Sequence, residues 1–253
     1  MNKNTADKNT IAKGVLTNHN YIYFMKYTND TELFELMKIE LFTAVVGDVM
    51  DRMGLFHQFL PPYLRPLRED MVVTGRAMPV LEADVFEEVG TGRNNQVMNY
   101  PFGLMLHALD DLKENEVYIC TGSSHRYALW GELMSTRALK LGAVGAVVDG
   151  YSRDTSGILK LDFPTFSLGR YSQDQGPRGK VIDYRVPIEF GGVRINPGDI
   201  IFGDLDGVVV IPQDKENEIV QAAHEKVTDE KLVHKALTQG MGAIEAFDKF
   251  GIM

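Results

Sequence analysis

The clearest pattern of apolar and polar positions lies in the middle of the chain. Residues 117–120 form a short apolar run, and residues 143–148 form a second one. Between them, residues 131–141 carry apolar side chains at helical spacing, and Gly142 follows as a helix end. A strand, a helix and a second strand within about 30 residues predict a βαβ unit with parallel strands, which we place at residues 116–149.

Helical spacing of apolar residues also occurs on both sides of this unit. Residues 31–54 predict two helices, the second capped by Thr43 and ended by Gly54. Residues 104–112 predict a short helix, and residues 214–238 predict a long, charged, amphipathic one. Helices therefore flank the predicted strands along most of the chain.

Two further segments have the residue composition of β-strands. Residues 72–80 and 165–212 contain β-branched runs separated by turn residues, and glycines recur at short intervals in the second segment, which is typical of a barrel or a sandwich. We therefore expect an α/β protein with one domain, residues 31–253, that ends in a C-terminal helical segment. Residues 1–30 are predicted to be an N-terminal extension, either docked on the body or a neighbouring subunit, or a disordered tail.

Charge and composition narrow the class of partner. The chain has 253 residues, of which 26 are basic and 35 acidic, so its formal net charge is −9. This balance argues against nucleic acid or an anionic membrane as partner, and no apolar run reaches the ~20 residues of a spanning helix. The first residues lack the apolar segment of a secretory signal, and the single cysteine, Cys120, excludes an internal disulfide. We therefore expect a cytoplasmic protein with neither kind of partner.

Candidate chemistry gathers at one edge of the predicted sheet. The loops that follow the two parallel strands meet there: one leads into Gly131 and Glu132, and the other carries Arg153 and Asp154. Ligands favour this edge in open α/β sheets, and free amides at a helix start attract anions. A guanidinium pairs with a carboxylate in two-pronged geometry, and carboxylate oxygens suit Mg²⁺. The sequence therefore predicts a pocket shared by a small acid and a metal ion.

Ordinary structural explanations exist for each of these residues, and other candidates are weaker. An Arg–Asp loop pair is most often a surface ion pair, and an acidic residue in a first helical turn complements the helix dipole. Residues 90–92 (Gly-Thr-Gly) lack the third glycine of a dinucleotide fingerprint. His125 and Arg126 could touch a ligand or form a solvated loop pair. Asp204 and Asp206 could bind a metal, although Asp and Gly are also common in hairpin turns.

At these motifs the sequence resembles the family that contains regulator of ribonuclease activity A and the 4-hydroxy-4-methyl-2-oxoglutarate aldolases. The matching segments span roughly residues 40–240 and are residues 49–54, 75–77, 130–133, 138–145, 148–154 and 203–212. The resemblance implies a central β-barrel-like sheet with flanking helices. It also implies a homotrimer or homohexamer with sites between subunits.

The resemblance further implies how a substrate is held. In aldolase members, pyruvate is bound by the backbone at positions matching Gly131 to Met134, with Leu133 between them, and by the arginine matching Arg153. These residues are therefore the expected substrate-binding set, and Arg153 is also expected to take part in catalysis.

The same resemblance implies a divalent cation. The residue matching Asp154 ligates Mg²⁺ or Mn²⁺, and the position of Glu132 acts on the metal through water. A glutamate from the C-terminal helix of a neighbouring subunit assists catalysis. Spacing from Gly240 favours Glu230 for this role, and Glu225 is the alternative.

One position departs from the family pattern. Aldolase members generally carry an acidic residue three positions after the metal-binding aspartate, where this chain has Gly157. Our leading hypothesis is a divalent-metal-dependent lyase that cleaves a carbon–carbon bond of a short 2-oxo acid, such as 4-hydroxy-4-methyl-2-oxoglutarate or oxaloacetate, and releases pyruvate. The alternatives are a non-catalytic regulator that inhibits a ribonuclease or another partner protein, and a sensor that binds its ligand without turnover.

Overall fold

The computed structural model describes residues 26–85 and 94–252. Its helices are α1 Asp30–Glu40, α2 Thr43–Arg52, the 3₁₀ turn η1 Gln96–Asn99, α3 Met105–Asp110, α4 Glu132–Lys140, α5 Thr155–Lys160, α6 Glu216–Thr238 and α7 Ala243–Phe250. Its strands are β1 Arg65–Pro66, β2 Val73–Asp84, β3 Glu116–Thr121, β4 Ala128–Trp130, β5 Gly145–Val148, β6 Tyr151–Ser152, β7 Thr165–Ser167, β8 Gly179–Tyr184, β9 Ile188–Phe190, β10 Val193–Ile195, β11 Ile200–Gly203 and β12 Val208–Ile211.

The main sheet has eight strands and is built around the predicted βαβ unit. Its order is β1-β7-β5-β3-β2-β11-β12, and β8 pairs with the far end of β2. β3 and β5 are parallel, with Val117 opposite Gly145 and Cys120 opposite Val148, and α4 connects them. The βαβ prediction is therefore confirmed, and helix α4 differs from the predicted range by one residue at each end.

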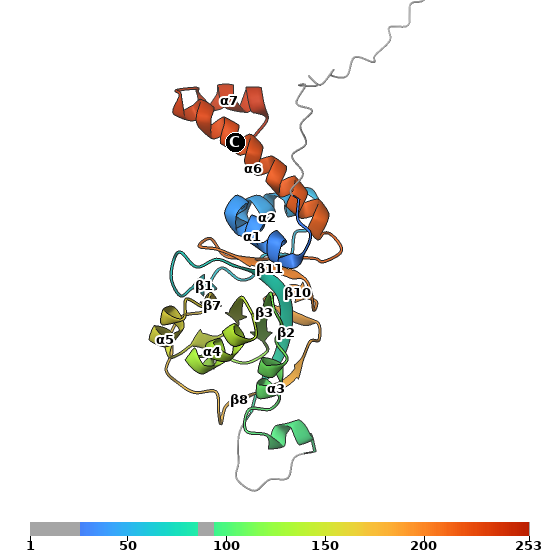
Figure 1. Cartoon of the computed structure of the whole chain (residues 1–253), viewed down its shortest axis with the longest axis vertical. Helices are drawn as coiled ribbons and strands as arrows, with labels where there is room; N and C mark the ends of the chain where they lie inside the picture. The colour runs from blue at the N-terminus through green and yellow to red at the C-terminus, as the bar shows by residue number, and fades with distance from the viewer. Residues whose placement is uncertain (1–25, 86–93, 253) are drawn as a thin grey trace, which may run out of the picture.

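Strand β2 curls the sheet. It pairs with β3 along one side, while its first half pairs with β11 and its second half with β8 on the other side. The register shifts between Leu81 and Glu82, and such an irregularity bends a strand and increases its twist. The result is a curled half-barrel with flanking helices, as the family resemblance implied (Figure 1).

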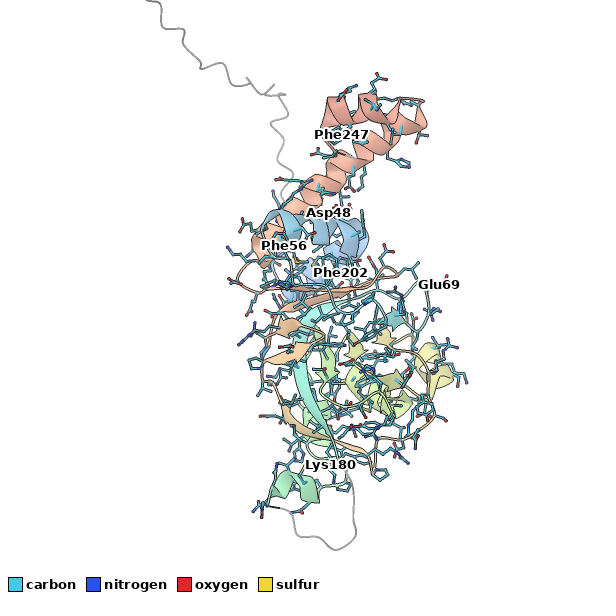
Figure 2. The ribbon with its side chains drawn as sticks, turned by 180° about the vertical axis from the view of Figure 1, so that it is seen from behind. Asp48, Phe56, Glu69, Lys180, Phe202 and Phe247 are labelled. Atoms are coloured by element: carbon cyan, nitrogen blue, oxygen red, sulfur yellow. The ribbon has the colours of Figure 1, made fainter. Side chains whose placement is uncertain are left out.

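Apolar side chains fill the space on both faces of this sheet. One buried cluster lies under α3 and α4, a second lies between the sheet and α1, α2 and α6, and a third is enclosed with β9 and β10. Phe202 of β11 belongs to the second cluster and lies where the helices meet the sheet (Figure 2). Cys120 is fully buried in the first cluster, as expected for an inert core residue.

The start of α2 corrects one prediction. Thr43 is the first residue of the helix rather than its cap, and Phe42 holds the cap position without a side-chain bond. The capping acceptor comes instead from the distant end of β11, because Asp204 accepts hydrogen bonds from the Thr43 amide and hydroxyl, both at 2.7 Å. Asp204 also accepts from the Asp206 amide, so the structural explanation of this pair holds. Gly54 follows α2 with a φ of +79°, as predicted.

Other predicted helices and loops differ from the observed ones in length and content. The predicted helices at 104–112 and 214–238 are observed as the shorter α3 and α6, and the loop predicted between β3 and α4 contains β4, which pairs with β6. Residues 90–92 and most of the predicted N-terminal extension lie outside the described residues. Within the described ranges, no helix combines the length and the apolar composition needed to cross a membrane.

Candidate active site

The βαβ edge brings the predicted residues Gly131, Arg153 and Asp154 into one place. Gly131 precedes α4 in an extended conformation, and no side chain caps the amide groups at the helix start. The backbone amide of Arg153 donates to the carbonyl of Trp130 at 2.9 Å, which fixes the second loop beside the first. A Cβ atom on Gly131 would lie 3.0 Å from Oδ2 of Asp154. The carboxylate of Asp154 therefore closely approaches the backbone at the start of α4.

Asp154 has an uncommon backbone conformation. Its φ of 53° and ψ of 34° are left-handed, a region that residues other than glycine rarely adopt, although Asp and Asn tolerate it better than most. Its carbonyl accepts from the amide of Gly157 at 2.9 Å, so α5 begins directly after it. Strained residues of this kind concentrate at functional sites. The half-exposed carboxylate lies 3.7 Å from Nε of Arg153.

The guanidinium of Arg153 is held from a second direction. Its Nη1 lies 3.0 Å from Oδ1 of Asp174, in the segment between β7 and β8. Asp174 could not be predicted from the sequence, because no motif surrounds it and it is 20 positions from Asp154. In the folded chain, the bridge between Ala128 and Asp174 and the hydrogen bond from the Ala128 amide to the Gln173 carbonyl place it beside the site.

These residues line a pocket of about 280 Å³. The predicted residues Gly131, Leu133, Met134, Arg153 and Asp154 all contribute to its walls. Residues that the sequence analysis did not predict complete the lining: Phe102, Met105, Leu106, Leu109, Ala128, Leu129, Trp130, Asp174 and Gln175. The pocket therefore combines a charged end with an apolar wall.

Glu132 lies beside this pocket and does not line it. Its exposed side chain extends over α5, where a Cβ atom on Gly157 would lie 2.1 Å from its Cδ and Oε2 atoms. The absence of a side chain at position 157 is thus what makes room for this placement of Glu132. The departure noted in the sequence has a direct structural counterpart, since one carboxylate occupies the space that a second one would need.

The C-terminal glutamates lie on another part of the molecule. Glu230 is on α6, which packs against α2 above the sheet, whereas α4 lies beside the sheet (Figure 1). Its carboxylate accepts from Lys226, whose ammonium group also lies 2.8 Å from Asp48. Glu225 is an exposed residue of the same helix. The role of either glutamate in the site of a neighbouring subunit stays a prediction.

The loop pair His125 and Arg126 makes contacts outside the pocket. Nε2 of His125 lies 2.8 Å from Oδ1 of Asp149, and the hydroxyl of Tyr63 donates to the same oxygen at 3.2 Å. Burial and the carboxylate of Asp149 raise the pKa of Tyr63 to about 12. Arg126 binds Asp84 at 2.9 Å. Neither member of the pair is among the pocket residues, so the structure favours the loop-pair explanation.

A hard cation fits the donor groups of the charged end. No group of three or more His, Cys, Asp or Glu side chains that could hold a metal occurs within residues 26–85 and 94–252. Mg²⁺, however, keeps several waters and needs only one or two protein carboxylates. Asp154 offers such a carboxylate. It is half exposed and lies next to the space at Gly131 that a Cβ atom would occupy.

Comparison with known proteins places the chain in a family. The family model described as RraA-like (Aldolase/RraA) matches residues 43–210. A protein of Halalkalibacterium halodurans, provisionally named 4-hydroxy-4-methyl-2-oxoglutarate aldolase, is 33% identical over 207 residues, which cover 81% of this chain and 89% of that protein.

Solved structures agree with this fold. A crystal structure described as novel cellulases from microbes associated with the gut ecosystem has a TM-score of 0.72 at 34% identity and covers 82% of this chain and 89% of the other. Streptomyces coelicolor RraAS2, described as an unusual member of the RNase ES inhibitor RraA protein family, has a TM-score of 0.68 at 23% identity and covers 83% and 99%, a likeness of fold alone. With a model match over most of its length and a relative aligned along nearly all of its own, this chain belongs to the RraA-like family.

Proposed function

We propose that this protein is a divalent-metal-dependent lyase that cleaves a carbon–carbon bond of a short 2-oxo acid and releases pyruvate. One observation carries the proposal: a single pocket contains the Arg153 guanidinium, the Asp154 carboxylate and the uncapped start of α4. A guanidinium and free helix amides bind a carboxylate, and a nearby carboxylate binds a hard cation. The aldolase name of the Halalkalibacterium relative supports the same reaction class.

The residues of this chain would divide the work as follows. Arg153 and the amides at the start of α4 bind the substrate carboxylate, while Asp174 holds the guanidinium in place. Asp154 would hold Mg²⁺ or Mn²⁺, and the bound ion would supply a Lewis acid that stabilises negative charge developing on the 2-oxo oxygen. Trp130 is buried and forms part of the pocket wall beside this end.

Aldol cleavage also requires a base. The bond between C3 and C4 breaks, its electron pair stays on C3 as the enolate of pyruvate, and the C4 hydroxyl loses its proton and becomes a carbonyl. Glu132, acting through water, and a C-terminal glutamate of a neighbouring subunit, Glu230 or Glu225, are the proposed bases. Decarboxylation of an acid such as oxaloacetate leaves the same enolate on C3 with carbon dioxide as the second product.

A substrate panel tests the proposal. The purified full chain is incubated with oxaloacetate and with 4-hydroxy-2-oxo acids, including 4-hydroxy-4-methyl-2-oxoglutarate, with Mg²⁺ or Mn²⁺ or after treatment with EDTA. We expect pyruvate to be released only with the cation. Equal release after EDTA treatment would contradict metal dependence, and release from no acid in the panel would contradict a lyase.

Gly157→Ala tests the placement of Glu132. A methyl group at position 157 collides with the end of the Glu132 side chain, which is exposed and can move, so we expect the fold to persist. Alanine in helix α5 should even stabilise it by about 0.5–1 kcal/mol. We expect pyruvate release to fall about 10-fold, which is less than the 100-fold or more that a positioned general base contributes, because Glu132 acts through water and is moved rather than removed. Steady-state kinetics and thermal unfolding measure the two effects.

Ser156→Ala, an exposed change in the same helix, is the matched control: it should stabilise the chain by at most about 0.5 kcal/mol and leave turnover unchanged. If Gly157→Ala shifts the melting temperature and leaves turnover at the level of the parent chain, Glu132 has no part in the reaction.

A second candidate function is a regulator that inhibits a ribonuclease or another protein. The observation that favours it is the arm formed by the end of α6 and by α7, which extends away from the body and exposes Phe247 (Figure 2) and Ile244. Exposed apolar side chains of this kind often form protein contacts. Inhibition of a purified RNase E-type enzyme by a chain carrying Asp154→Asn, and its loss in Ile244→Ser/Phe247→Ser, would support this candidate.

A further inference from the structure

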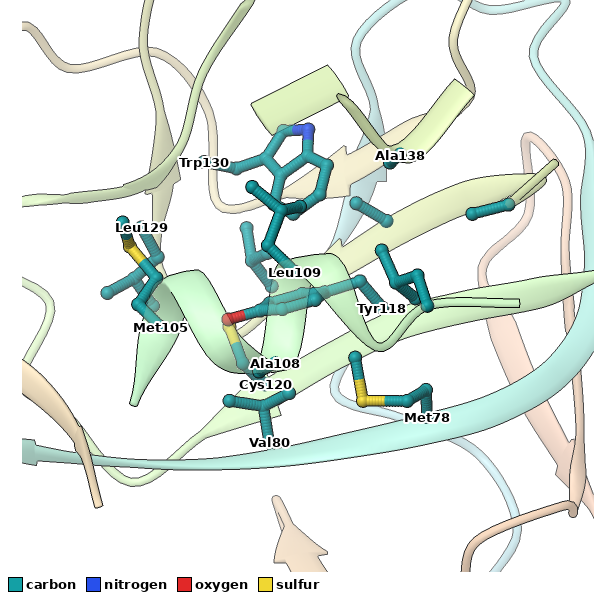
Figure 3. Packing of buried hydrophobic residues seen from close by; sticks show 14 of the residues in the cluster. Met78, Val80, Met105, Ala108, Leu109, Tyr118, Cys120, Leu129, Trp130 and Ala138 are labelled. Carbon is teal, nitrogen blue, oxygen red and sulfur yellow. The ribbon is translucent and has the colours of Figure 1, made fainter. Parts of the chain in front are cut away.

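The pocket has two chemically different parts. Its charged end contains Arg153, Asp154 and Asp174. The rest of the lining is largely hydrocarbon from α3, β4 and α4 and from Phe102 before α3, and Gln175 adds one amide. Its larger apolar side chains include Met105, Leu106, Leu129, Leu133 and Met134. Figure 3 shows Met105 of α3 and Leu129 of β4 lying together, and both belong to one buried cluster. A ligand anchored at the charged end therefore extends along an apolar wall.

The charges of the lining residues limit what that ligand can be. Among the pocket residues that the structure describes, Arg153 is the single cation, and it already contacts the carboxylates of Asp154 and Asp174. A carboxylate at the near end of a ligand can pair with Arg153 and with the amides of α4. A second carboxylate at the far end would lie against these partly exposed apolar side chains without a cation to pair with, so it gains nothing from the wall. An apolar group in the same place gains free energy because it buries hydrocarbon.

We propose that the preferred substrate is a 2-oxo acid with a single carboxylate and an apolar group at the far end of its carbon chain. The inference rests on the proposed function for the 2-oxo acid head and adds the class of the tail. Cleavage breaks the C3–C4 bond, and the C4 hydroxyl proton passes to a base. C3 retains the electron pair and takes up a proton, so the products are pyruvate and an apolar aldehyde or ketone. A pocket of about 280 Å³ accommodates a short tail.

Binding of two uncleavable acids of the same shape tests the tail independently of catalysis. In 5-methyl-2-oxohexanoate an isopropyl group replaces the far carboxylate of 2-oxoglutarate. Calorimetry on the full chain with Mg²⁺ is expected to show at least about 10-fold tighter binding of 5-methyl-2-oxohexanoate, since each buried methylene contributes a factor of about three to four. Equal binding, tighter binding of 2-oxoglutarate, or binding of neither acid would overturn the inference.

Cleavage of the corresponding hydroxy acids separates this inference from the proposed function. The full chain is assayed with 4-hydroxy-5-methyl-2-oxohexanoate and with 4-hydroxy-2-oxoglutarate. Faster cleavage of the first acid supports both claims. Faster cleavage of the second overturns the inference and leaves the lyase function standing. Selective binding of the apolar acid without cleavage of either compound supports the tail class and overturns the lyase function.

A charge placed in the wall provides a second test. Leu106 lines the pocket from α3 and is 55% exposed, whereas Leu139 of α4 is 47% exposed and does not line it. Arginine is tolerated at both positions because both side chains already reach solvent. Leu106→Arg is expected to shift the ratio of the two affinities at least 10-fold in favour of 2-oxoglutarate, and Leu139→Arg to leave the ratio unchanged. An unchanged ratio in Leu106→Arg would overturn the inference.

Discussion

Asp154→Asn is expected to lower kcat/KM for pyruvate release by at least about 100-fold, the size of effect seen when one group that stabilises transition-state charge is removed. Asparagine keeps the shape of the side chain and tolerates the left-handed backbone at this position, so the expected loss reflects the carboxylate charge. Binding of Mn²⁺, followed by electron paramagnetic resonance, should weaken in parallel. This second measurement does not depend on knowing the substrate.

Asp162 offers a matched control at the other end of α5. It is also a left-handed aspartate, with the same φ of 53°, but its exposed side chain contacts Arg68 and does not line the pocket. Asp162→Asn should leave both pyruvate release and Mn²⁺ binding within about twofold of the parent chain, since surface ion pairs contribute little. Equal losses in the two variants would assign the effect to α5 as a whole and would remove Asp154 from the proposed metal site.

The βαβ unit could be predicted from the sequence because its signals are local. Short apolar runs, helical spacing between them and a terminal glycine specify strand, helix and strand without reference to the rest of the chain. Loops that follow parallel strands meet at one edge of a sheet, and this brings Gly131, Arg153 and Asp154 together. The pocket contains all three. The charged end of the site was thus accessible to sequence reasoning.

The remainder of the site depends on contacts between distant segments. Asp174 comes from the segment between β7 and β8, and the apolar wall includes Phe102 and Leu106 from before and within α3. Nothing in the local sequence around these residues distinguishes a pocket wall from ordinary core or surface. The cap of α2 likewise depends on a contact between distant segments, because Asp204 accepts a hydrogen bond from Thr43, which is 161 positions away.

Gly157 has one meaning in the family pattern and another in the folded chain. As a departure from the pattern, it indicates a missing carboxylate. In the folded chain it is buried, and the Glu132 side chain fills the space beside it. The two positions are therefore alternatives for a carboxylate in the same space, and a change at one must be considered together with the other.

Glu82→Gln is expected to raise the free energy of unfolding by about 4 kcal/mol at pH 8 and to have little effect near pH 4. Glu82 is fully buried on β2, one carboxylate oxygen accepts from Gln175, and the other has no hydrogen-bond partner among the residues that the structure describes. Burial raises its pKa from the ordinary value of 4.5 to about 8, and the hydrogen bond from Gln175 offsets this only in part. The folded chain therefore retains the proton of this carboxyl group at neutral pH.

The sign follows from the two protonation states. Below pH 4.5 the carboxyl group is protonated in both the folded and the unfolded chain, so it does not affect the pH dependence there. Between pH 4.5 and about 8 the unfolded chain releases the proton while the folded chain retains it, and stability falls as the pH rises. Glutamine does not titrate, so urea unfolding at several pH values should show the difference between variant and parent growing up to about pH 8 and then levelling.

Asp84, two residues along the same strand, should behave in the opposite way. Burial opposes its ionisation, but hydrogen bonds from the Ser124 amide and the Ser124, Tyr127 and Arg126 side chains together lower its pKa to about 2. The stability that this carboxylate contributes is present above its ordinary pKa of 3.8 and is lost as the pH falls towards 2. Asp84→Asn should therefore destabilise the chain at neutral pH, where Glu82→Gln stabilises it.

The outcome that would contradict the Glu82 prediction is a constant difference in unfolding free energy between Glu82→Gln and the parent chain from pH 4 to pH 9. It would mean that Glu82 is ionised in the folded chain.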